Sequence, residues 1–185
     1  MCIRDRIVTL TPNRGAMVAQ PTEKEAREVF EVRRMIEPTL IECFIASATA
    51  EDIAVLTQCI NEEEAARASG DMRRAIRLSG DFHLHIANAA DHQTLGRILR
   101  ELVSRTSLIL MTYSDNHLQS RAEATSCGCQ EHRALLDAIR LRDPREAARL
   151  MREHLGQLET QLRFTATEDS APDLASLFGG ATPSP

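Results

Sequence analysis

Apolar residues at intervals of three and four positions dominate this sequence, and this spacing constrains its fold more than any other feature. The first such stripe, which follows Thr22, consists of Val29, Val32, Ile36, Leu40 and Cys43. Residues with this spacing share one face of an α-helix. Apolar residues make up 43% of the chain but aromatic residues only 3%, which disfavours a β-rich fold. The pattern therefore predicts an all-α protein, an antiparallel helical bundle.

Local capping signals predict where the helices begin. Thr22 with Glu25 forms a capping box, and Thr49 caps a second helix that runs to about residue 68. Asp143 followed by Pro144 supplies an N-cap and a proline at the first helical position. Pro38 is expected to kink or split the first helix. The remaining helices are expected after residues 70–71 to about residue 90, and over residues 94–113, 130–141 and 144–164.

The two ends of the chain differ in composition from this helical body. Residues 7–18 form two short β-prone runs around a Pro-Asn-Arg-Gly turn, which is typical of a hairpin. The leader "MCIRDR" resembles a translated sequencing adapter and is interpreted as an artefact. We expect residues 1–20 to be this leader and hairpin, residues 21–165 to be one helical domain, and residues 166–185 to be a loose tail rich in Ser, Pro, Gly and Ala.

Charge and cysteine content narrow the setting of the protein. The net charge of −5 gives no overall attraction to nucleic acid or to an anionic membrane. Five cysteines without a disulfide-framework pattern, and the lack of a signal-peptide core or a membrane-length apolar run, favour a reducing, cytoplasmic location.

Three of the six histidines lie within "DFHLHIANAADH", residues 81–92, but only His83 is expected to point inward. His83 is in line with the apolar residues Ile76 and Ala87. The neighbouring polar positions share the opposite, solvated face of the helix: Asp81, His85, Asn88 and His92. Asp81 and His85 form an Asp-x-x-x-His pair, which we interpret as a surface ion pair rather than two metal ligands.

Two further histidines fall on apolar stripes, His132 before Leu135 and His154 beside Met151. Three helices would then each carry one inward histidine. A divalent cation satisfies three neutral imidazoles at once, whereas the alternative is three core histidines, each hydrogen-bonded to a neighbour. Spacing alone leaves both interpretations open. No carboxylate is expected beside these histidines as a general base.

Two other features admit a binding role and a structural one. Cys127-x-Cys129 with His132 is either part of a zinc site or two reduced loop thiols. Arg33 lies on the first apolar stripe, and an inward guanidinium needs an anion. That anion is either Glu37, one turn further on, or the carboxylate of a ligand.

Several segments together resemble the FCD ligand-sensing domain of the FadR-like group of GntR-type bacterial transcription regulators. The resemblance covers residues 7–164. "VTLTPNRGAMVA" resembles the wing hairpin of the family's winged helix-turn-helix, and "EVFEVRRMIEP" resembles the first sensor helix. "FHLHIANAADHQTL", "EHRALLDAI" and "DPREAARLMREHL" resemble the three segments that carry the family's histidines.

The resemblance implies a set of site residues. In the metal-binding members an aspartate and three histidines hold a divalent metal, and the histidine positions match His83, His132 and His154. The aspartate position is Ser79 here, which implies an open coordination position or a metal-free pocket. Zinc or a nickel-like ion is the expected metal. His92 matches a turn position of the family.

The resemblance also implies a function. We expect an effector-sensing and dimerisation domain that binds a small organic acid, with Arg33 and Ser79 as effector-binding residues and a homodimer as the assembly. Arg14, at the tip of the wing, is the candidate DNA contact. No recognition helix precedes the wing in this sequence, so specific DNA binding is expected only of the full-length protein. The alternatives are a small metal-dependent enzyme of the hydrolase type and a purely structural dimerisation domain.

Overall fold

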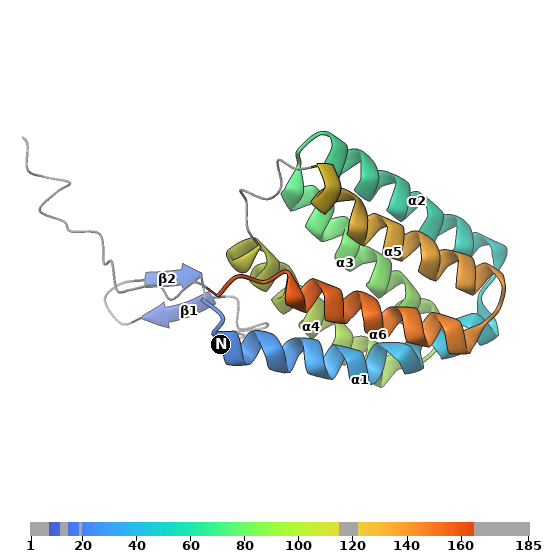
Figure 1. The fold of residues 1–185 in the computed structure, drawn as a ribbon. Coiled ribbons are helices and arrows are strands. Elements are labelled where there is room, and N and C mark those ends of the chain that lie inside the picture. Colours follow the sequence, from blue (N-terminus) through green and yellow to red (C-terminus); the bar gives the residue numbers. More distant parts are fainter. Residues whose placement is uncertain (1–7, 12–14, 19, 115–121, 165–185) are drawn as a thin grey trace, which may run out of the picture.

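The computed structural model describes the backbone of residues 8–11, 15–18, 20–114 and 122–164, and the side chains of residues 20–114 and 128–164. Within this part of the chain the protein is an all-α bundle preceded by a hairpin (Figure 1). The expected fold class is thereby confirmed. The helices are α1 (Glu23–Ser47), α2 (Ala50–Ala68), α3 (Met72–Ala89), α4 (Gln93–Tyr113), α5 (Ala122–Arg140) and α6 (Pro144–Thr160).

The hairpin consists of β1 (Val8–Thr11) and β2 (Gly15–Val18). The two strands pair antiparallel, with residue 8 opposite residue 18 and residue 11 opposite residue 15. This agrees with the two β-prone runs of the sequence. The turn residues 12–14, including Arg14, lie outside the described residues.

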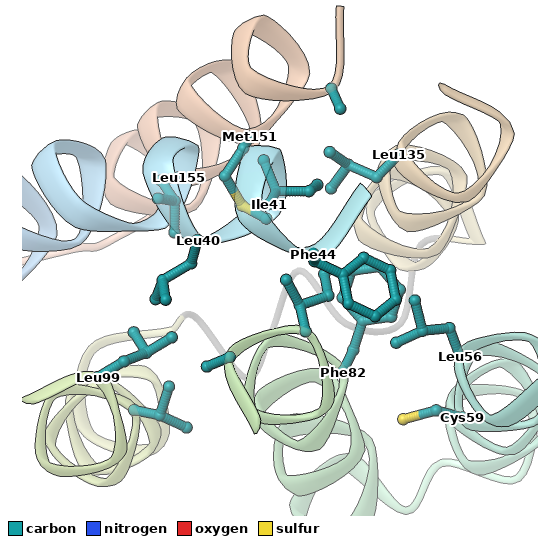
Figure 2. Close-up of a cluster of buried hydrophobic side chains, with 14 of the residues drawn as sticks. Leu40, Ile41, Phe44, Leu56, Cys59, Phe82, Leu99, Leu135, Met151 and Leu155 are labelled. Carbon is teal, nitrogen blue, oxygen red and sulfur yellow. The ribbon is translucent and has the colours of Figure 1, made fainter. Parts of the chain in front are cut away.

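Helix α1 packs against α3, α4 and α6, while α5 bridges α2 and α6. Figure 1 shows α1 and α6 side by side, with α2 and α5 along the far side of the bundle. All six helices send apolar side chains into one core (Figure 2). Phe44 and Phe82 are among its largest fully buried members. The core therefore holds α1, α3, α5 and α6, which carry the candidate site residues, in fixed positions.

The expected capping signals are confirmed. Glu25 donates its backbone N–H to Thr22 Oγ1 over 3.2 Å, and its carboxylate accepts from the Thr22 backbone N–H over 3.0 Å. Thr49 and Asp52 form the same reciprocal pair at the start of α2. Asp143 caps α6, and Pro144 occupies its first turn. These hydrogen bonds satisfy backbone donors that a helix start otherwise leaves free.

Pro38 was expected to kink or split the first helix, and the split is ruled out, because α1 runs unbroken from Glu23 to Ser47 with Pro38 inside it. Proline removes one backbone hydrogen bond from a helix. The helix is buried on both sides of that position, by Phe30 before it and by Leu40 after it. Burial of α1 against three other helices outweighs the missing hydrogen bond.

Two expected boundaries also need correction. Helix α5 begins at Ala122, eight residues before the expected start, although residues 122–129 show no helical apolar stripe. Helix α6 ends at Thr160 rather than near Phe164. The chain leaves the helix there because Leu162 pairs with Ser114, and the Arg163 backbone N–H donates to the Tyr113 carbonyl over 2.9 Å. This pairing joins the end of α6 to the end of α4.

Candidate metal and effector site

Three buried histidines from three helices meet in the interior of the bundle. His83 lies on α3, His132 on α5 and His154 on α6, and their exposed fractions are 1%, 0% and 1%. One ring nitrogen of each lies within 4.8 Å of those of the other two. The Nε2 atoms of His83 and His154 are 3.3 Å apart. The expectation that these three side chains converge is confirmed.

Each of these histidines presents its Nδ1 atom to a glutamate. His132 Nδ1 lies 2.8 Å from Glu63, and His154 Nδ1 lies 2.6 Å from Glu131. His83 Nδ1 lies 2.6 Å from Glu37 Oε2, although that contact lacks the alignment of a regular hydrogen bond. A carboxylate beside Nδ1 favours the tautomer that carries its proton there. The Nε2 lone pairs are then available to a ligand.

Two arginines complete this arrangement from α1 and α2. Arg33 Nε donates to Glu37 Oε1 over 2.5 Å, and both side chains are buried. Arg67 donates to Glu63 Oε1 through two nitrogens, over 2.8 and 3.1 Å. The structural alternative for Arg33, a pair with Glu37, is therefore present. Its Nη2 atom nevertheless has no hydrogen-bond partner among the residues that the structure describes.

The buried glutamates remain ionised in this environment. Burial opposes the charge of Glu37, but Arg33 and His83 overcome that effect and lower its pKa to about 2. Burial likewise opposes the charge of Glu63, whose contacts with His132 and Arg67 lower its pKa to about 2. The result is two stable carboxylates that can only accept hydrogen bonds from the imidazoles.

Burial favours the neutral form of two of the imidazoles, His83 and His154. Burial lowers the pKa of His83 to about 3, against the opposing effect of Glu37. Burial also lowers the pKa of His154, although Glu131 acts in the other direction. Neutral histidine is the form that ligates metals.

The ring nitrogens that do not face a glutamate fit a divalent metal ion. His132 Nε2 is buried and has no hydrogen-bond partner within the described part of the chain. Two nitrogens bound to one zinc ion at tetrahedral angles lie about 3.3–3.4 Å apart. The 3.3 Å between the Nε2 atoms of His83 and His154 matches that separation. If both rings carry their protons on Nδ1, the two Nε2 lone pairs face each other at this distance and repel, and a cation between them would remove that unfavourable contact.

Several other residues singled out from the sequence lie on or next to α3 and α4. Ser79 is buried on α3, one turn before His83. Asp81 pairs with Arg77 over 3.2 Å, so the expected ion pair with His85 is replaced by one with an arginine. His92 is the N-cap of α4, in agreement with its expected position in a turn.

Among the described residues, the one cluster that could hold a metal consists of the three histidines and does not include Cys129. The Cys129 thiol is buried beside the Arg67 guanidinium, and burial raises its pKa to about 11. His132 is turned to Glu63 and to the other two histidines. The side chain of Cys127 lies outside the described residues.

The expectation of no carboxylate beside the histidines as a general base missed the three glutamates that lie against their Nδ1 atoms. Glu37 and Glu63 each lie on the buried side of a helix, four positions from an arginine. A glutamate on an apolar stripe with an arginine one turn away was a signal of an inward ion pair. Glu131 follows no such pattern, and only the packing of α5 against α6 brings it to His154.

Comparison with known proteins identifies this arrangement of helices. Residues 28–157 match the family model described as "FCD domain". The chain belongs to the FCD domain family. The expected FCD domain is thereby confirmed, and the family match includes all three histidines. The FCD fold is that of a ligand-sensing regulatory domain.

Two curated relatives of this FCD protein are transcriptional regulators. It is 23% identical over 148 residues to the uncharacterized HTH-type transcriptional regulator YdhC of Bacillus subtilis, covering 79% of this chain. It is 26% identical over 168 residues to the HTH-type transcriptional repressor GlaR of Escherichia coli, covering 83% of this chain. The matches span 63% and 71% of the lengths of these two relatives.

Solved structures share the fold. Escherichia coli McbR/YncC superimposes with a TM-score of 0.72 at 19% identity, covering 86% of this chain and 80% of that protein. A GntR-type putative regulator from Rhodococcus gives a TM-score of 0.71 at 20% identity, with coverages of 86% and 74%. Among the described residues, none of the helices combines the length and apolar character needed to cross a membrane.

Proposed function

We propose that this chain senses a small carboxylate effector for a GntR-type transcriptional regulator, through a divalent metal ion held by three histidines. One observation carries the proposal. One ring nitrogen of each of His83, His132 and His154 lies within 4.8 Å of those of the other two in a buried centre, while each Nδ1 atom lies beside a glutamate. Metal-ligating histidines in proteins almost always have such a carboxylate or carbonyl partner on the other nitrogen.

The residues of the proposed site have different roles. The Nε2 lone pairs of the three histidines would ligate the metal, and the glutamates orient the rings and keep the protons on Nδ1. When bound, the metal supplies a positive centre that attracts an anion and leaves coordination positions open for it. Ser79, one turn before His83, leaves that centre less neutralised than an aspartate would.

Arg33 is the proposed second anchor of the effector. Its Nε atom is used by Glu37, but Nη2 is a buried donor without a partner among the described residues. Guanidinium nitrogens bind carboxylates with well-defined geometry. A small organic acid that reaches both the metal and Nη2 would satisfy this donor. The expected effector-binding roles of Arg33 and Ser79 stay predictions.

Calorimetric titration tests both parts of the proposal. Zinc chloride is titrated into the metal-stripped chain, and acetate, lactate and succinate are then titrated into the loaded and the stripped protein. We expect zinc to bind and the acids to bind only to the loaded form. His132→Ala should abolish zinc uptake. Acid binding that survives chelation and His132→Ala would overturn recognition through a metal.

The role of Arg33 has a matched control in its neighbour. Arg33→Gln should weaken acid binding by about tenfold or more, since a buried charge-assisted hydrogen bond contributes about 1.5–3 kcal/mol. Arg34→Gln should have no effect, because Arg34 pairs with Glu159 at the surface of α6. Equal acid affinity in the wild-type and Arg33→Gln proteins would exclude the anchor.

DNA binding and dimerisation complete the proposal. Full-length relatives of this domain are named as HTH-type regulators, and we propose that effector binding here changes the spacing of two DNA-binding heads in a homodimer. Arg14 is the proposed DNA contact of the hairpin. Sedimentation equilibrium of this chain should give twice its mass of 20.6 kDa. A monomer at micromolar concentration would remove the dimer from the proposal.

A further inference from the structure

Glu63 contributes a fully buried carboxylate to this centre from α2, a helix that carries none of the three histidines. Its Oε2 atom lies 2.8 Å from His132 Nδ1. Its Oε1 atom accepts from Arg67 Nη2 over 2.8 Å and from Arg67 Nε over 3.1 Å. Both carboxylate oxygens are therefore occupied, and the side chain is held in one orientation.

The ring of His132 is held from a second direction by Phe82. The two rings stack with their centroids 4.3 Å apart and an angle of 26° between their planes. Stacking restrains the tilt of an imidazole but does not distinguish its two nitrogens. The contact with Glu63 makes that distinction, because an ionised carboxylate only accepts hydrogen bonds.

We propose that Glu63 is the positioning residue of His132, fixing the Nδ1–H tautomer and thereby aiming an unprotonated Nε2 at the proposed metal. This inference rests on the proposed function, because it assigns a role at the same centre. Without the carboxylate, the proton of His132 is free to occupy Nε2, and that tautomer has no Nε2 lone pair with which to ligate. Arg67 keeps the buried carboxylate charged and thereby supports the same tautomer.

Glu64 provides a matched control at the next position of α2. Its carboxylate also pairs with α5, accepting from Arg133 over 2.8 and 3.0 Å, but this pair is half-exposed and contacts none of the three histidines. Glu63→Gln and Glu64→Gln therefore make the same chemical change in the same helix interface. Only Glu63→Gln removes a negative charge that lies beside one of the three imidazoles.

Zinc titration of the metal-stripped chain is the first test. We expect Glu63→Gln to raise the zinc dissociation constant about 10- to 100-fold, Glu63→Ala to raise it at least as much, and Glu64→Gln to leave it unchanged. Cobalt loading adds a spectrum that loss of stability alone does not alter, and its visible bands should shift in Glu63→Gln but not in Glu64→Gln. Unchanged zinc affinity and cobalt spectrum in a folded Glu63→Gln protein would overturn the inference while leaving the metal site intact.

A second test needs no variant, so it can be carried out even if the Glu63→Gln protein fails to fold. Nitrogen-15 shifts of the histidine rings in the metal-stripped wild-type chain report which nitrogen carries the proton. We expect His132 to be protonated on Nδ1 and not on Nε2. The Nε2–H tautomer in the folded protein would overturn the inference. Failure of the wild-type chain to bind zinc would instead refute the proposed metal site, and the role assigned to Glu63 with it.

Discussion

The buried pair of Arg33 and Glu37 allows a quantitative prediction for Glu37→Gln. The substitution keeps the shape of the side chain but leaves the guanidinium of Arg33, which is 2% exposed, without an anion. Removing one partner of a buried ion pair costs about 3–5 kcal/mol. The pKa of Glu37 gives an independent magnitude: its fall from 4.5 to about 2 corresponds to about 3 kcal/mol.

The sign of the pH dependence follows from the lowered pKa of Glu37. A carboxylate with a lower pKa in the folded state contributes its full stabilisation above the pKa of the unfolded state, 4.5, and loses it as the pH falls toward 2. The difference in stability between the wild-type and Glu37→Gln proteins should therefore be largest at pH 7. It should shrink progressively below pH 4.5, as the wild-type carboxylate becomes protonated.

Urea-induced unfolding of metal-stripped protein measures this difference directly. At pH 7, Glu37→Gln should lower the free energy of unfolding by about 3 kcal/mol, whereas Glu42→Gln, at an exposed position of the same helix, should change it by less than about 0.5 kcal/mol. Repeating the comparison at pH 3 should give a smaller effect of Glu37→Gln. A loss below about 1 kcal/mol at pH 7, or an equal loss at pH 3, would refute this account of the pair.

Two further predictions concern the packing of the bundle. A Cβ atom at Gly80 would lie 2.8 Å from Val103 Cγ1 on α4, so Gly80→Ala should destabilise the protein by about 1–3 kcal/mol in thermal unfolding. As a control, Gly156→Ala should be neutral or stabilising, because a Cβ atom there meets nothing within 4 Å. Equal effects of the two substitutions on stability would contradict the close approach at Gly80. Arg142 donates to the carbonyls of Ile45 and Ala48 over 2.6 and 2.8 Å. Arg142→Ala should therefore lower the free energy of unfolding by about 1–3 kcal/mol by the same measurement. Unchanged stability of this variant would exclude a role of Arg142 in capping α1.

The fold was largely predictable from the sequence because its signals are local. Helix starts at Thr22, Thr49 and Asp143 depend on side chains that bond to backbone atoms three residues away. Pro38 shows where local reasoning fails, since the cost of the missing hydrogen bond is local but the compensating burial of α1 comes from three other helices. The early start of α5 likewise has no local signal in its polar residues.

The site was predictable in part for the same reason. An inward histidine is recognisable because its neighbours at helical spacing are apolar, and this identified His83, His132 and His154 correctly as buried. Their partners are contacts between helices: Glu63 is 69 residues from His132 in the sequence. No spacing within one helix predicts such a pair, which depends on how the bundle packs.

Two connected series of polar contacts lead to the cluster of three histidines. One series runs from Arg33 through Glu37 to His83, and the other runs from Arg67 through Glu63 to His132. Helices α1, α2, α3 and α5 thereby contact the centre through charged or ligating atoms, and α6 joins them through its histidine. A ligand at the Nε2 atoms that binds one arrangement of these helices more tightly than another shifts the population between them. Arg33 pairs with Glu37, and its Nη2 atom has no partner in the described part of the chain. An effector carboxylate at that nitrogen would therefore act on α1, the helix that follows the hairpin.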